Sequence, residues 1–259
     1  MTPLRRVAWK TTTLALTACL YLLVTASPLF ALPPGLVSAW SGNGNVLDST
    51  GNNNATFTGS YVAGHGGQQA FAFNGTSTQF TTSANGFPTG SANRTISMWV
   101  YMNTFTYPWN NETALFGYGT HQSGAQQDFI LMTEGNQWLV ANNGVQFLGP
   151  TLSTSTWYYV AVVQNNNSQQ LYVNGVLVAT GALPINTPAA GVTAGYFPDP
   201  PYTTFYLNGN LQNIRVYNQA LTATQISADM VGSVPEPPAV LLLGCGCLIV
   251  LVSKRSIIS

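Results

Sequence analysis

The stretch that most constrains the fold is Trp157–Thr180, which reads WYYVAVVQNNNSQQLYVNGVLVAT. Its aromatic and β-branched runs are typical of strands, and its polar clusters are typical of turns. Asn174-Gly175 lies between two apolar runs and is a strong signal for a two-residue hairpin, because a type I′ turn needs positive φ at both central residues. The stretch therefore predicts an antiparallel meander with strands at Trp157–Val163, Leu171–Val173 and Val176–Val178.

A two-residue turn also predicts the register of this hairpin. We expect the cross-strand pairs Val173–Val176, Tyr172–Leu177 and Leu171–Val178. The strand Trp157–Val163 is apolar on both of its alternating faces, which is typical of a strand in the middle of a sheet that is covered on both sides.

Charge is scarce in this chain. Of its 259 residues only 5 % are charged, against about 25 % in an average soluble domain. Five of the seven basic residues lie near the two ends, which leaves Arg94 and Arg215 in the interior. Two cations cannot neutralise a row of phosphates, so nucleic acid is not expected as a partner. The three cysteines, Cys19, Cys245 and Cys247, fall in terminal apolar segments, so the interior must fold without a disulfide.

Residues 1–31 have the features of a secretory signal peptide. A basic region at Arg5, Arg6 and Lys10 precedes the apolar run Leu14–Val24, and Ala26 and Ala31 are candidate cleavage positions. Cys19 suggests lipoprotein processing as an alternative, but the apolar run before it is short. We therefore expect the chain to be exported.

Several further segments have the sequence motifs of one protein family, in the same order. They are Asp48-Ser49-Thr50-Gly51-Asn52, Gly67–Thr76, Thr95–Tyr101, Leu171–Gly175 and Asn208–Leu221. Together they resemble the laminin-G-like, concanavalin A-like jelly-roll domains of bacterial surface proteins over residues 35–230. The resemblance and the regular strand spacing both predict an all-β, two-sheet antiparallel β-sandwich at 32–231. Thr222 opens a capping box, which predicts a short helix that buries Ile226 and Met230.

The C-terminal segment 232–259 carries a second pattern. Pro235-Glu236-Pro237 precedes an apolar run at 239–252 and the basic pair Lys254-Arg255. This order resembles the PEP-CTERM sorting signal, which implies a transmembrane helix and exosortase, a membrane protease, as a partner. As a helix the apolar run would span about 21 Å, less than the ~30 Å hydrocarbon core, so local thinning and snorkelling would have to cover the difference. An ordinary tail anchor is the alternative.

Catalysis is not expected. Glycoside hydrolases on this fold need two carboxylates about 5–10 Å apart, and no predicted strand has alternating acidic residues. Asp128 and Glu134 are separated by a turn-length interval, with no matching partner in the sequence. His65 and His121 lie in glycine-rich segments without a nucleophile nearby, which favours surface histidines. We therefore predict that the chain is not an enzyme, with a concanavalin-fold hydrolase as the remaining alternative.

No cofactor is expected except a structural calcium ion, for which Asp48 is the candidate ligand. The resemblance implies this role, since Asp48 occupies the position of the family's early aspartate. The family's later aspartate pair is replaced here by Gln212 and Asn213, and neutral amides are weaker ligands for a hard cation. The alternative is that Asp48 caps its own turn, and the sequence favours that reading.

Binding is the function that remains. Sugar recognition uses exposed aromatic faces with amide partners, and Tyr107, Trp109 and Tyr202 lie in proline-containing segments. We expect these three to contact an extracellular polysaccharide or surface protein, in a carbohydrate-binding or adhesion module held at the membrane or released to the cell surface. The alternative is a purely structural matrix protein.

Overall fold

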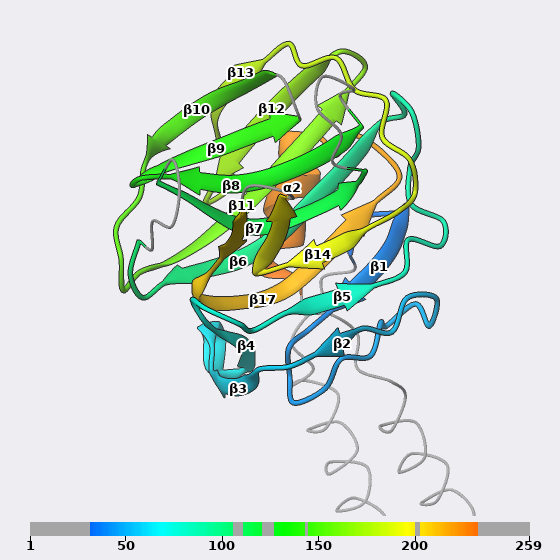
Figure 1. The fold of residues 1–259 in the computed structure, drawn as a ribbon. Helices are drawn as coiled ribbons and strands as arrows, with labels where there is room; N and C mark the ends of the chain where they lie inside the picture. The colour runs from blue at the N-terminus through cyan, green and yellow to red at the C-terminus, as the bar shows by residue number, and fades with distance from the viewer. Residues whose placement is uncertain (1–31, 106–110, 121–126, 143–144, 200–202, 233–259) are drawn as a thin grey trace, which may run out of the picture.

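The computed structural model describes residues 32–232, apart from 106–110, 121–126, 143–144 and 200–202. Two antiparallel sheets lie face to face, which confirms the predicted all-β sandwich (Figure 1). Sheet A has the order β13 (Val176–Gly181), β12 (Ser168–Val173), β11 (Trp157–Asn165), β6 (Arg94–Met102), β17 (Asn208–Tyr217), β4 (Gln69–Asn74) and β3 (Ser60–Ala63), and β1 (Leu36–Trp40) also pairs with β17. Sheet B has the order β10 (Val145–Thr151), β9 (Gln137–Asn142), β8 (Asp128–Glu134), β7 (Glu112–Gly119), β14 (Val192–Ala194), β5 (Phe80–Thr82) and β2 (Thr56–Phe57).

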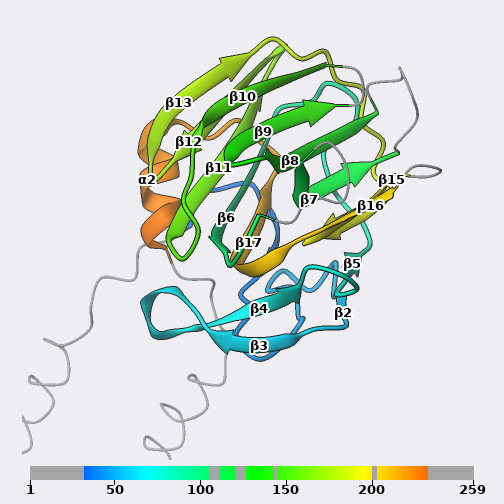
Figure 2. The same ribbon diagram turned by 60° about the vertical axis from the view of Figure 1, so that its left-hand side comes forward.

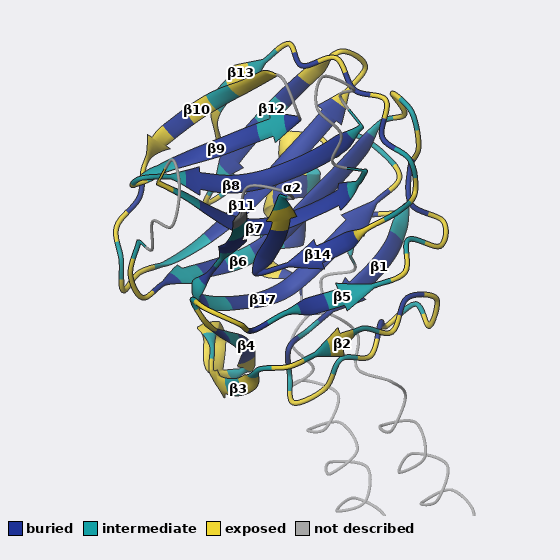
Figure 3. Cartoon of the chain, viewed as in Figure 1, coloured by how far each residue is buried: buried dark blue, intermediate teal, exposed yellow. Residues whose placement is uncertain are grey.

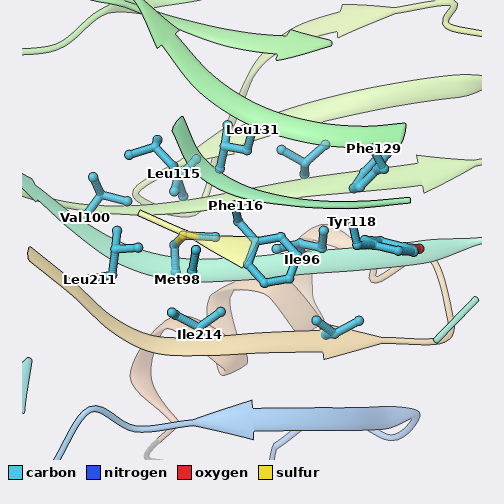
Figure 4. Packing of buried hydrophobic residues seen from close by; sticks show 14 of the residues in the cluster. Ile96, Met98, Val100, Leu115, Phe116, Tyr118, Phe129, Leu131, Leu211 and Ile214 are labelled. Carbon is cyan, nitrogen blue, oxygen red and sulfur yellow. The ribbon is translucent and has the colours of Figure 1, made fainter. Parts of the chain in front are cut away.

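The main core fills the space between the two sheets. Alternate side chains of β6 and β17 point toward those of β7 and β8, and Figure 4 shows them interleaved. Members of this core include Ile96, Met98, Val100, Leu115, Phe116, Leu131, Leu211 and Ile214. Burial is greatest in the central strands, whereas β3, β10 and β13 at the sheet edges carry exposed residues (Figure 3).

Two further elements cover the outer faces of the sandwich. Helix α2 (Ala223–Val231) packs on the outer face of sheet A, where Ile226 meets Tyr159 and Tyr217 in a second apolar cluster. The hairpin of β15 (Tyr196–Asp199) and β16 (Thr203–Tyr206) packs on sheet B through Phe197 and Phe205. Figure 2 shows the resulting layers, with α2 on one side and the hairpin on the other.

The predicted meander at Trp157–Thr180 forms β11, β12 and β13. β11 lies between β6 and β12, and the pairs Val173–Val176 and Tyr172–Leu177 are confirmed. The predicted pair Leu171–Val178 is wrong, because a bulge at this point pairs Leu171 with Ala179. The bulge adds one residue to β13, so the small Ala179 packs against the core beside Leu171.

Two proline-containing segments form strands. Phe197–Asp199 and Thr203–Thr204 belong to the β15–β16 hairpin, whose stacked rings Tyr196 and Tyr206 lie 6.1 Å apart. β10 also contains a proline, in Gly149-Pro150. Both segments lie at or outside a sheet edge, where a proline needs no N–H partner.

Helix α2 begins with the expected capping box, in which Thr222 and Gln225 exchange hydrogen bonds. Ile226 is buried, as predicted, whereas Met230 is only half-buried. The buried polar residue of this helix is Asp229. It forms an ion pair with Arg215 of β17 at 2.9 Å, and both side chains are fully buried.

The Asp229 carboxylate also accepts hydrogen bonds from three hydroxyl groups: Ser97 Oγ at 2.5 Å, Tyr159 OH at 2.6 Å and Tyr217 OH. Burial and the adjacent Asp229 charge raise the pKa of Tyr159 and of Tyr217 well above the usual tyrosine range. Both phenols therefore stay protonated and act as donors. This buried network fixes α2 on the sheet.

Within the described residues, no helix is long and apolar enough to cross a bilayer. The predicted signal peptide 1–31 and the predicted transmembrane helix 239–252 lie outside those residues.

Candidate functional site

A group of aromatic side chains lies on the outer face of sheet A, beyond the end of α2. Trp99 and Tyr101 are two residues apart on β6 and therefore share a face. Trp157 of β11 pairs with Tyr101, and their ring centroids are 5.3 Å apart. His65 reaches the same face from the segment between β3 and β4, which Figure 2 shows on the same side of the sheet as α2. We call these four residues the aromatic platform.

His65 stacks directly on Trp99. The two ring centroids are 3.7 Å apart and the planes are inclined by 16°. His65 begins a single 3-10 turn, His65–Gly67, in which Gly66 and Gly67 have φ of +66° and +80°. A residue with a Cβ rarely adopts this conformation, so the glycines allow the chain to curl over the sheet.

Gln212 holds this turn at the backbone of His65. Its Oε1 accepts from His65 N at 2.7 Å and its Nε2 donates to His65 O at 3.1 Å. Nε2 also donates to Gln68 Oε1 at 3.0 Å. Gln212 is buried, so both ends of its amide are used to fasten the turn to β17.

Asn213 follows Gln212 at a bulge in β17, where the pairing with β6 is interrupted. It adopts φ of +51°, a left-handed conformation that Asn tolerates better than most residues. Its Nδ2 donates to Gln68 Oε1 at 3.4 Å. Its Oδ1 is buried, and no donor from the described part of the chain reaches it. A buried acceptor without a partner costs about 1–3 kcal/mol, which a ligand donor would recover.

These residues enclose an open pocket of about 350 Å³. Its walls are the His65–Trp99 stack, the three amides Gln68, Gln212 and Asn213, and the end of α2 from Met230 to Gly232. The pocket thus combines an aromatic wall with amide donors and acceptors, which is the composition of a site for a small polar ligand with an apolar face.

The described residues that line the pocket carry no formal charge at neutral pH. Partial burial lowers the pKa of His65 from its ordinary value of 6.5, so the imidazole is neutral. The two interior cations are buried elsewhere: Arg215 pairs with Asp229, and Arg94 donates to Tyr118 OH and to the carbonyl oxygens of Gly90 and Ala92.

The residues predicted to bind ligand, Tyr107, Trp109 and Tyr202, lie outside the described residues, as do the sorting residues Pro235, Glu236 and Pro237. His65 is exposed, as predicted for a surface histidine, but its stacking on Trp99 and the platform as a whole were not predicted from the sequence. One signal could have found part of it. Trp99 and Tyr101 alternate with the core residues Met98 and Val100, so their face is aromatic without belonging to the main core.

Asp48 does not fit a calcium site. Its Oδ1 accepts from Ala39 N and Thr50 N, and its Oδ2 accepts from Thr50 Oγ1 and Asn53 N, all within 3.1 Å. Both carboxylate oxygens are therefore occupied by donors of the protein, and Asp48 caps its own turn. Among the described residues, no three His, Cys, Asp or Glu side chains gather to hold a metal ion.

The expectation that Glu134 has no acidic partner is wrong. Glu134 of β8 lies directly opposite Glu112 of β7. Partial burial raises the pKa of Glu112 to about 7, and the charges of Glu134 and Asp199 add to the effect. This pair could not be predicted from the sequence, because the two residues come from different strands.

Residues 73–227 match the sequence model of the concanavalin A-like lectin/glucanase superfamily, of the laminin G type 3 class. The chain belongs to this superfamily. Membership agrees with the two-sheet sandwich and with the resemblance of the strand motifs. No match was found among curated protein sequences.

Solved structures share the fold at low identity. Domain 4 of an extracellular GH43 arabinanase from Geobacillus stearothermophilus, solved with arabinotriose, is 21 % identical with a TM-score of 0.58, over 75 % of this chain and 97 % of that one. A mutant Trypanosoma rangeli sialidase is 17 % identical with a TM-score of 0.60, over 78 % of this chain and 35 % of that one. The Botulinum neurotoxin serotype D binding domain is 13 % identical with a TM-score of 0.58, over 78 % and 51 %. This chain therefore spans nearly all of the first structure but only a third to a half of the other two.

Proposed function

We propose that this protein is a carbohydrate-binding module and that the aromatic platform with its amide pocket is the binding surface. The main observation behind the proposal is the pocket that is lined by the stacked rings of His65 and Trp99 and by Asn213, whose Oδ1 has no donor from the described residues. The arabinanase domain solved with a bound oligosaccharide has the same fold, which supports the proposal by analogy only.

The chemistry of the pocket suits a sugar. A pyranose or furanose ring presents C–H groups that pack on an aromatic ring and hydroxyl groups at its rim that donate and accept hydrogen bonds. The half-exposed rings of Tyr101 and Trp157 extend the apolar surface beyond the pocket. A ligand hydroxyl that reached the buried Oδ1 of Asn213 would satisfy it.

A glycan array probed with the purified full-length chain tests this proposal. Selective binding that weakens about tenfold in Trp157→Ala, or ~1.4 kcal/mol, would support it. Tyr206→Ala is the matched control, because it removes a half-buried ring from the β15–β16 hairpin on the other sheet. Binding that is equally weakened in both variants, or absent from the array, would contradict the proposal.

We also propose that the chain is exported and processed through a PEP-CTERM/exosortase route, which leaves the domain at the cell surface or in the matrix. The support is the sequence order of Pro235-Glu236-Pro237, the apolar run 239–252 and Lys254-Arg255. The basic pair is expected to remain cytoplasmic by the positive-inside rule. Membrane contact would then be through residues 239–252.

Changing Pro235, Glu236 and Pro237 to alanine leaves the apolar run unchanged. In a host with exosortase, the parent should lose its C-terminal peptide, and the variant should accumulate at full length in the membrane fraction. Mass spectrometry of the C-terminal peptide decides. An intact tail on the parent would favour an ordinary anchor.

Two alternatives remain. A purely structural matrix protein predicts no selective glycan binding on the array. A hydrolase is favoured only by the Glu112–Glu134 pair, in which a carboxyl of pKa about 7 faces a second carboxyl group. Release of reducing sugars from bound glycans, abolished by Glu112→Gln, would support catalysis. We propose binding without turnover.

A further inference from the structure

We propose that the pocket selects neutral glycans and rejects acidic ones. This inference rests on the proposed function, since it specifies the class of glycan for the same site. Among the described residues, the pocket is lined by amides, an indole, a neutral imidazole and the end of α2, and none of these side chains is cationic. A uronic or sialic acid carboxylate bound there would lose water without gaining a positive partner, which disfavours its binding.

The interior cations cannot turn toward the site without breaking the fold. Arg215 is fully buried beneath α2 and donates to the Asp229 carboxylate and to the backbone oxygens of Asp229 and Gly232. Arg94 is fully buried at the other end of β6 and is bonded to Tyr118. Acidic ligands therefore meet no mobile positive charge from residues 32–232.

The hydrogen-bonding groups of the pocket also favour neutral ligands. Asn213 is 6 % exposed and lines the pocket, and its buried Oδ1 has no partner from the described residues. Its Nδ2 is already committed to Gln68. The group that the pocket lacks is therefore a donor. A sugar hydroxyl supplies a donor, whereas a carboxylate offers only acceptors and would lie against another oxygen.

Affinity electrophoresis of the full-length chain tests this inference with matched pairs of polymers. The neutral members are glucomannan, galactomannan, mixed-linkage β-glucan and pullulan. The acidic member of each pair is the same polymer after oxidation of its primary hydroxyl groups to carboxylates. We expect at least one neutral polymer to bind at least tenfold more tightly than its oxidised form, with little dependence on salt between 50 and 500 mM, as estimated from screening.

Asn213→Gly tests the role of the unpartnered oxygen. Glycine accepts the positive φ at this position, and we expect neutral binding to weaken about fivefold or more. Asn166→Gly is the matched control, because Asn166 also has positive φ (+55°) but lies in the exposed turn between β11 and β12. Equal weakening in the two variants would refute the assigned role of Asn213.

The remaining outcomes separate the two proposals. Equal or tighter binding of an oxidised polymer would overturn the inference and leave glycan binding intact. No retardation by any of the eight polymers would overturn glycan binding together with the inference.

Discussion

The buried network around Asp229 gives the sharpest prediction for stability. Asp229→Asn keeps the shape of the side chain but removes the charge that pairs with Arg215 at 2.9 Å, and both residues are fully buried. Removing one partner of a buried ion pair typically costs 3–5 kcal/mol, because the other charge is left without compensation. For a domain of this size that corresponds to about 6–20 °C in Tm.

Urea unfolding followed by tryptophan fluorescence measures the change in the free energy of unfolding. Thr224→Ala, an exposed position on the same helix, is the control and should stay within about 0.5 kcal/mol of the parent. The double variant Arg215→Met with Asp229→Asn removes both charges. Its free energy of unfolding should be at least ~1 kcal/mol higher than the two single changes predict by addition.

If the losses in the free energy of unfolding were additive, the predicted coupling between Arg215 and Asp229 would be wrong, since the two charges would not depend on each other. A loss below about 1 kcal/mol in Asp229→Asn would also contradict the prediction, because a fully buried arginine without its counter-ion should destabilise the fold by more than this.

Three further outcomes follow from individual sites. Asn174→Ala with Gly175→Val should lower the free energy of unfolding by about 3 kcal/mol, because both residues have positive φ (+51° and +80°); a change within 0.5 kcal/mol in urea unfolding would contradict this. Glu112→Gln should stabilise the protein by about 1 kcal/mol at pH 8 and leave it unchanged at pH 4, after discounting the pKa shift for partial exposure. The sign follows from a folded-state pKa raised from 4.5 to about 7, so that wild-type stability falls as pH rises through this window; a pH-independent difference in Tm would oppose it. Excess Ca²⁺ should change Tm by less than ~2 °C relative to a chelator, since the oxygens of Asp48 are occupied; a rise of many degrees would indicate a cage that Asp48 completes.

Local sequence signals predicted much of this fold. The structure confirms the Asn174-Gly175 turn, the central position of β11, which is apolar on both faces, and the capping box at Thr222. All three were predicted from residues close together in the sequence. The bulge that pairs Leu171 with Ala179 was not predictable in this way. It depends on how β13 packs against the core, which is a tertiary effect.

The site was less predictable, because it combines distant segments. His65 comes from the turn between β3 and β4 and Trp99 from β6, and Gln212 of β17 bonds His65 from 147 positions further along the chain. The same reason hid the Glu112–Glu134 pair and the Arg215–Asp229 ion pair. Aromatic residues in proline-containing segments stand out in the sequence as candidates for binding, whereas aromatic residues in a strand pattern are usually explained by packing.

Glycan binding at the aromatic platform can be tested by two-dimensional ¹H–¹⁵N NMR of the full-length chain, which monitors the indole N–H signals of the tryptophans while a glycan is added. Trp40 and Trp138 are fully buried and serve as internal controls. Titration with a glycan that binds should shift the Trp99 and Trp157 signals and leave those of Trp40 and Trp138 in place. A shift confined to Trp109, with Trp99 and Trp157 unchanged, would place binding at Trp109 and contradict binding at the aromatic platform.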